Sequence, residues 1–82
     1  MSVRVLYFAG LREALGTGGE TLELPPGVTT AGGLRDWLAG HGREALVGVK
    51  NLRCAVNQDM AGPDAAIGDG DEIAFFPPVT GG

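Results

Sequence analysis

Hydrophobic and polar residues alternate along four short segments of this chain, which is the pattern of half-buried β-strands. The segments are rich in β-branched and aromatic residues, and they predict strands at residues 3–8, 20–24, 52–57 and 72–76. Pro25-Pro26-Gly27 ends the second segment, and a long connection, residues 58–71, precedes the last. The pattern therefore predicts a small sheet.

Helical spacing of apolar residues occurs in two further places. Residues 9–15 predict a short helix that ends at Gly16. A longer helix is expected to begin at Thr29 or Thr30, either of which can accept a hydrogen bond from its first turn, and to end at Gly40. Its apolar stripe, which we expect to pack on the sheet, contains Ala31, Leu34, Trp37 and Leu38.

The order strand, strand, helix, strand, strand predicts an α+β domain, in which one main helix packs on one face of a mixed sheet. An N-terminal hairpin and a last strand close to the start of the chain give the β-grasp, or ubiquitin-like, arrangement. Residues 43–47 predict a short extra helical turn. We expect residues 1–76 to form this domain and residues 77–82 to form an extended C-terminal tail ending in Gly-Gly.

Two aromatic side chains fall on the polar sides of the strands. Arg4 and Glu72 mark the solvent-facing sides of the first and last strands, and the alternation places Phe8 and Phe76 on the same sides. We expect Met60, in the turn after the third strand, to join them. Exposed apolar surface of this composition is typical of partner-binding sites. The alternative is that a twist or a bulge turns both rings into the core.

The chain ends in a proline-stiffened run, Pro77-Pro78-Val79-Thr80, followed by Gly81-Gly82. A terminal glycine offers a carboxylate that no side chain shields, and six residues reach up to about 20 Å. With an ordinary pKa of about 3.5, this group is an anion at neutral pH and must be activated, for example as an acyl-adenylate, before it can transfer an acyl group. The tail predicts a carrier that partner enzymes load and unload. The alternative is a chain end without a function.

Composition and charge exclude several functional classes. The 82 residues suffice for one domain, and 44% hydrophobic residues with 20% charged ones are ordinary for a globular fold. A net charge of −4 argues against nucleic acid as a partner. No apolar run approaches the roughly 20 residues of a membrane span, and the first residues do not resemble a signal peptide. One cysteine cannot form an internal disulfide, so we expect a cytoplasmic protein.

No motif along the chain predicts that it catalyses a reaction by itself. The sequence contains no Ser-His-Asp set, no cluster of metal ligands and no phosphate-binding glycine loop, so we expect neither a bound cofactor nor a metal. His41 stands alone near the end of the main helix, where we expect a solvated side chain. Cys54 shares a strand face with Leu52 and Val56, which predicts a small core residue, with a redox or sulfur-relay role as the alternative.

Several stretches resemble the small subunits of molybdopterin synthase, the MoaD family. The most specific is the C-terminal run at residues 69–82, which reads DGDEIAFFPPVTGG. Residues 5–9 with the following Leu11-Arg12-Glu13 and Gly16 are similar to that family's first strand and helix, and residues 55–58 to its third strand. The likeness extends over the whole chain, although residues 44–53 carry no mark of the family.

The resemblance implies a β-grasp sulfur carrier. In this family an adenylyltransferase that resembles ubiquitin-activating enzymes uses ATP to adenylate the terminal glycine, here Gly82. A persulfide-bearing sulfur donor protein then converts it to a thiocarboxylate. The tail, residues 77–82, enters the active site of the large synthase subunit, where cyclic pyranopterin monophosphate receives the sulfur. The family forms a heterotetramer, and its apolar contacts with partners fall on Phe8, Met60 and Phe76.

Two other classes of function use the same terminal glycine. A ubiquitin-like protein modifier would transfer the activated glycine to a lysine amine. A sulfur carrier of another pathway would serve thiamine synthesis or tRNA thiolation. A stand-alone binding domain with an inert tail is the remaining alternative.

Overall fold

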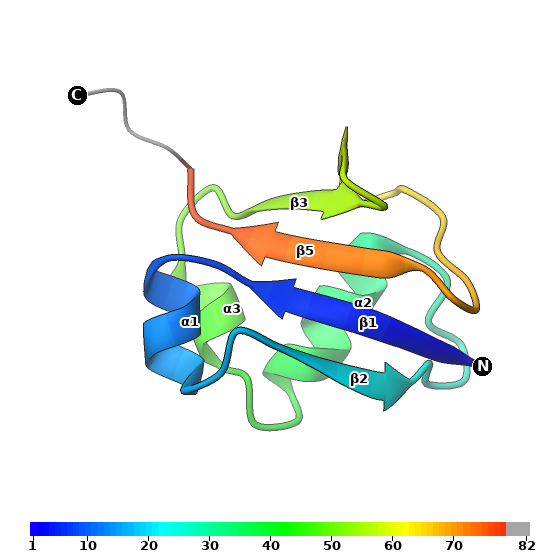
Figure 1. The fold of residues 1–82 in the computed structure, drawn as a ribbon, viewed down its shortest axis with the longest axis horizontal. Helices are drawn as coiled ribbons and strands as arrows, with labels where there is room; N and C mark the ends of the chain where they lie inside the picture. The colour runs from blue at the N-terminus through cyan, green and yellow to red at the C-terminus, as the bar shows by residue number, and fades with distance from the viewer. Residues whose placement is uncertain (79–82) are drawn as a thin grey trace.

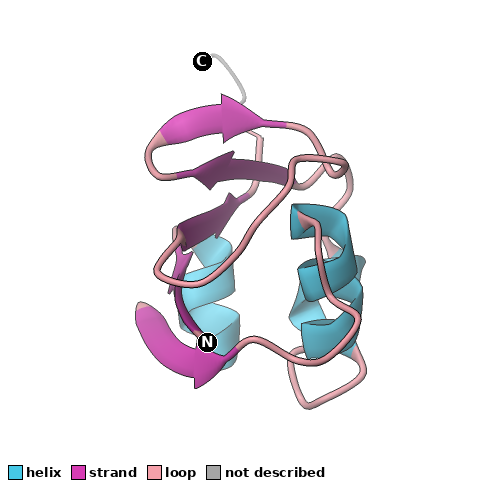
Figure 2. Cartoon of the chain, turned by 90° about the vertical axis from the view of Figure 1, so that its right-hand side faces the viewer, coloured by secondary structure: helices cyan, strands magenta, loops and turns pink. Residues whose placement is uncertain are grey.

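The computed structural model describes residues 1–78 of the chain. Within them the elements are, in chain order, β1 (Ser2–Tyr7), α1 (Gly10–Leu15), β2 (Gly19–Glu23), α2 (Ala31–Ala39), α3 (Ala45–Gly48), β3 (Arg53–Val56), β4 (Asp59–Ala61) and β5 (Glu72–Phe76). The strands form one sheet in the order β2-β1-β5-β3-β4, in which β1 and β5 are parallel and the other pairs antiparallel. The helix α2 lies across one face of this sheet (Figures 1 and 2). The α+β, β-grasp prediction is confirmed.

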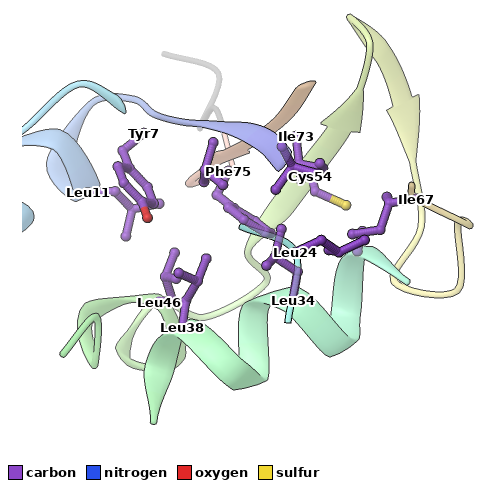
Figure 3. Close-up of a cluster of buried hydrophobic side chains, with 13 residues drawn as sticks. Tyr7, Leu11, Leu24, Leu34, Leu38, Leu46, Cys54, Ile67, Ile73 and Phe75 are labelled. Atoms are coloured by element: carbon purple, nitrogen blue, oxygen red, sulfur yellow. The ribbon is translucent and has the colours of Figure 1, made fainter. Parts of the chain in front are cut away.

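The strands form because their alternating residues bury one face. On β1, Val3, Val5 and Tyr7 are at most 1% exposed, and so are Ile73 and Phe75 on the neighbouring β5. These side chains meet those of α2 in one continuous core (Figure 3). The pairing of β1 with β5 at the centre of the sheet joins the first and the last strand of the chain.

The expected stripe of α2 is confirmed at three of its four positions. Ala31, Leu34 and Leu38 have no measurable exposure, whereas Trp37 is only partly buried at the edge of the core. Thr30 is the N-cap, and its hydroxyl accepts a hydrogen bond from the backbone N–H of Gly33 at 3.1 Å. This bond satisfies one of the donors that a helix start leaves open.

A two-residue turn after β3 produces a strand that the sequence pattern does not predict. Asn57 and Gln58 both have positive φ, 52° and 71°, which is the conformation of a tight hairpin turn. The following residues form β4 and pair with β3, so the expected connection 58–71 is wrong over its first part. Glycine is common in the second turn position, and glutamine there hides the signal.

The remaining boundaries differ from the prediction by one or two residues, as hydrogen-bonding criteria usually shift them. The predicted short turn at 43–47 is the helix α3 (Ala45–Gly48). The last strand ends at Phe76, as expected. Residues 79–82 of the expected tail lie outside the described residues.

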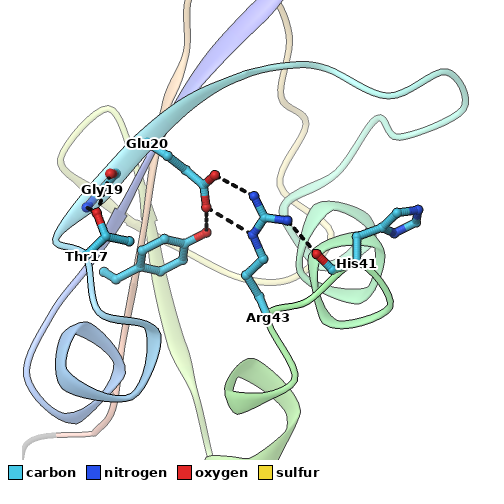
Figure 4. A network of polar contacts seen from close by, with 6 residues as sticks. Thr17, Gly19, Glu20, His41 and Arg43 are labelled. Carbon is cyan, nitrogen blue, oxygen red and sulfur yellow. Dashed lines mark hydrogen bonds and ion pairs between the residues drawn. The ribbon is translucent and has the colours of Figure 1, made fainter.

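A polar cluster fastens the loop between α2 and α3 to the sheet. The hydroxyl of Tyr7 donates to Glu20 on β2 at 2.7 Å, and Arg43 donates to both oxygens of the same carboxylate (Figure 4). Burial, followed by the Glu20 contact, raises the pKa of the Tyr7 hydroxyl. The pKa of the Glu20 carboxyl is lowered, chiefly by the hydrogen bonds that it accepts from Arg43.

Candidate functional site

An apolar row crosses the face of the sheet that α2 does not cover. Leu6 of β1 pairs with Ala74 of β5, Ala74 pairs with Ala55 of β3, and Ala55 pairs with Met60 of β4. Directly paired residues project to the same face of a sheet, so the four side chains lie side by side across four strands. The row is therefore a continuous apolar strip.

The two aromatic residues predicted to face solvent border this strip. Phe76 is the last residue of β5 and is partly buried, and Phe8 follows β1 directly and is 47% exposed. The backbone N–H of Phe8 donates to the carbonyl of Phe75, which holds the two chain segments together. Met60 is 64% exposed. Neither aromatic residue belongs to the core described above, so the alternative of rings turned into the core is not observed.

We call this surface the outer patch; its members are Leu6, Phe8, Ala55, Met60, Ala74 and Phe76. Ala55 and Ala74 are only 8% and 9% exposed, yet the alternation directs both away from the core side, so larger neighbours cover them. Small residues at these positions make the middle of the patch flat. Sequence reasoning missed Ala55 as a member because its link to Met60 depends on the unpredicted strand β4.

Charged residues lie next to the outer patch. Arg4 pairs with Glu72 on the same face, two residues before Leu6 and Ala74, and Arg53 pairs with Phe76. An apolar centre with a polar rim is the usual anatomy of a protein–protein interface.

The tail begins at the outer patch because it follows Phe76, which is both a member of the patch and the last residue of the central strand β5. Pro77 and Pro78 follow Phe76 directly and are partly buried. Proline fixes φ near −65°, so both residues favour one direction for the chain that leaves the sheet. The other predicted tail residues, Val79, Thr80, Gly81 and Gly82, lie outside the described residues. Their roles stay predictions.

Cys54 is a core residue, as expected. It is 8% exposed, and its thiol donates to the carbonyl of Ala61 at 3.3 Å. Burial raises the pKa of this thiol, which disfavours the reactive thiolate. The surroundings give no support to the sulfur-relay alternative.

His41 differs from the expectation of a plainly solvated side chain. It is exposed, but its ring stacks on Trp37 with a centroid distance of 3.9 Å, and its Nδ1 lies 2.6 Å from the Trp37 carbonyl oxygen. The two residues are one helical turn apart, which brings their side chains onto the same side of α2. His41 thus covers one face of the Trp37 ring.

The part of the chain that the structure describes contains no group of three or more His, Cys, Asp or Glu residues placed to hold a metal ion. Among residues 1–78, no helix is long and apolar enough to cross a membrane.

The sheet order and the helix packed on one face are those of a small β-grasp, or ubiquitin-like, protein. The chain belongs to the ThiS family, whose sequence profile matches residues 5–82. The molybdopterin synthase sulfur carrier subunit of Escherichia coli K12 is 39% identical over 82 residues, which cover 98% of this chain and 99% of the relative. The resemblance inferred from the sequence is confirmed.

Two solved structures connect the fold with different uses. Small archaeal modifier protein 1 of Haloferax volcanii matches with a TM-score of 0.79 and 27% identity over 95% of this chain and 98% of its own. A complex of subunits 1 and 2 of the molybdopterin-converting factor of Helicobacter pylori contains a chain that matches with a TM-score of 0.66 and 25% identity over the full length of both.

Proposed function

We propose that this chain is the sulfur carrier subunit of a molybdopterin synthase and that its terminal Gly82 carries the sulfur. The observation that carries the proposal is the full-length similarity to molybdopterin synthase sulfur carrier subunits. The outer patch at the root of the tail supports it, because a partner that binds the patch receives the C-terminus that follows Pro78.

In the proposed reaction sequence the partners supply the catalytic groups. A carboxylate oxygen of Gly82 attacks the α-phosphorus of ATP in the adenylyltransferase, and pyrophosphate leaves. The persulfide of the donor protein displaces AMP, and a thiol reductant cleaves the S–S bond to leave the thiocarboxylate. The large subunit then directs this sulfur to cyclic pyranopterin monophosphate. The small chain alone is not an enzyme in this scheme.

The outer patch is the proposed contact with the large subunit and the adenylyltransferase. Phe8 and Met60 supply exposed apolar area around the flat centre at Ala55 and Ala74, and the partly buried Phe76 borders the same surface. Aromatic anchors of this kind carry a large share of the binding energy in interfaces. Both partners need the same tail, so they bind in turn.

Mass spectrometry of the intact chain tests the proposal. The full chain is incubated with the adenylyltransferase, ATP and a persulfide donor, and its mass is expected to rise by the difference between a sulfur and an oxygen atom. A variant with one residue added after Gly82 is the matched control and should not change. An unchanged wild-type mass, when the same donor system loads a known carrier, contradicts the proposal.

The similarity to small archaeal modifier protein 1 favours a second candidate, a ubiquitin-like protein modifier. The same activated glycine would then form an isopeptide bond with a lysine of another protein. Immunoblots of cell extract should show covalent adducts of this chain that disappear when Gly82 is deleted. If no adducts form under conditions where the thiocarboxylate forms, the modifier function is rejected and the sulfur carrier function remains.

A further inference from the structure

A groove of about 410 Å³ opens between the start of α2 and the β3–β4 hairpin. Gly32 and Arg35 of α2 line one side, Cys54 and Met60 the other, and Phe75 and Pro78 also contribute. The volume lies within the range of sites that take a ligand or a few side chains of a partner. The outer patch and the groove share Met60, and the tail begins at the groove because Pro78 lines it.

The charge of the groove differs from that of the whole chain. Ten acidic and six basic residues give the chain a net charge of −4, but the groove is lined by Arg35 and Arg53 and by no acidic residue. Within residues 1–78, Arg35 forms an ion pair with Asp36, whose Oδ1 accepts a hydrogen bond from its Nε at 3.2 Å, and its terminal nitrogens make no hydrogen bond; Arg53 has no ion pair. The alternation of β3 directs the Arg53 side chain to the outer face beside Phe76, so Arg35 is the charged side chain that the groove itself presents.

The Arg35 charge acts on another residue of the groove lining, Cys54. It lowers the pKa of the Cys54 thiol, against the larger effect of burial, and both residues line the groove. The lining also contains apolar residues, among them Leu52, Phe75 and Pro78. The arrangement fits a chain segment that places an anionic group at Arg35 and apolar groups beside Phe75 and Pro78.

We propose that this groove is a second docking site for the large synthase subunit and that it takes a segment bearing a carboxylate side chain. The proposal deepens the proposed function and rests on it. Met60 belongs to the outer patch and Pro78 to the root of the tail, and both residues also line the groove. A partner that covers the patch and accepts the tail must therefore pass the mouth of the groove. The planar guanidinium of Arg35 binds a carboxylate through two parallel hydrogen bonds, and the apolar walls favour a peptide over a small free anion.

Binding of the full chain to the large subunit, measured by calorimetry, tests this role. Arg35→Gln is expected to raise Kd about tenfold, as for the loss of one charge-assisted hydrogen bond, and to flatten the dependence of Kd on salt. Arg35→Lys, which keeps the charge but not the planar pair of donors, should have a Kd between those of wild type and Arg35→Gln. Arg12→Gln on α1 is the matched control and should stay within about twofold of wild type.

Because Cys54 itself is buried, alkylation of Gly62→Cys in a Cys54→Ala background distinguishes occupation of the groove from long-range attraction; Gly62 lines the groove, is exposed and has no described atom within 4 Å of an added Cβ. N-ethylmaleimide reacts with this variant of the full chain alone and in the complex, and the modification of the small chain is read by mass spectrometry. We expect the complex to slow this reaction about tenfold or more, because the bound segment covers the sulfur. Inorganic phosphate at millimolar concentration should give no comparable protection.

The outcomes separate this inference from the proposed function. Wild-type affinity and salt dependence in Arg35→Gln, while Phe76→Ala still weakens the complex, overturn the groove and leave the outer patch standing. Equal alkylation rates with and without the large subunit, or protection by phosphate alone, also overturn it. If the wild-type chain does not bind the large subunit at all, both the inference and the proposed function fail.

Discussion

Alanine at Gly32 should destabilise the fold, although alanine is the better helix former. Gly32 lies in the first turn of α2, and its backbone N–H donates to the carbonyl of Pro63 at 2.8 Å. A Cβ at this position would lie 2.9 Å from both the Cβ and the carbonyl oxygen of Pro63. Part of that contact is backbone, so a side-chain rotation cannot relieve it.

The expected magnitude follows from three opposing contributions. Alanine gains up to about 1 kcal/mol of helix propensity. Overpacking costs about 1–3 kcal/mol, and weakening the bond to Pro63 costs about 1 kcal/mol. The net loss is about 1–3 kcal/mol. In a domain of 82 residues each kcal/mol lowers Tm by roughly 4–8 °C.

Two other helical glycines provide matched controls. At Gly33 the added Cβ would lie 3.2 Å from the Thr30 hydroxyl oxygen, a side-chain atom that can move, and at Gly48 it would meet no described atom within 4 Å. Thermal unfolding followed by circular dichroism should therefore rank Gly48→Ala at or above wild type, Gly33→Ala between the two, and Gly32→Ala lowest. If Gly32→Ala is as stable as Gly48→Ala, the close approach of α2 to Pro63 is not a constraint on this fold.

Three further predictions concern the interface, the polar cluster and the tail. Phe76→Ala should weaken binding to the large subunit by about 2 kcal/mol in calorimetry, whereas Val47→Ala, an equally apolar change at an exposed position of α3, should not; equal affinities would remove Phe76 from the interface. Because Arg43 lowers the pKa of Glu20 in the folded state, the Glu20 contribution is complete above the unfolded pKa of about 4.3 and is lost as pH falls through the folded pKa. Glu20→Gln should therefore lower Tm at pH 7, and the gap to wild type should close toward pH 3; a constant gap refutes the assignment. Deletion of Gly82 should leave Tm unchanged, since the described core is built from residues 3–75, and should abolish thiocarboxylate formation; a clear loss of Tm contradicts this.

Local patterns in the sequence were sufficient to predict the class of the fold and the two aromatic residues of the outer patch. The alternation in β1 and β5 predicted which side chains are buried, because a strand directs successive residues to opposite faces whatever it pairs with. The same rule predicted that Phe8 and Phe76 are outside the core. The run of residues after Phe76 pointed to a carrier through the chemistry of a terminal glycine, for which no fold is needed.

Tertiary structure decided the features that depend on contacts between distant residues. Gly32 is a poor helix residue by its own propensity, and only the approach of Pro63, 31 positions later, gives it a reason. Glu20 and Arg43 are 23 residues apart, and their pairing appears in no periodicity of the sequence. The groove likewise exists only because α2 brings Arg35 beside β3 and the tail root at Pro78. Periodicity reports the face that each element buries, whereas these sites arise where the faces and edges of separate elements come together.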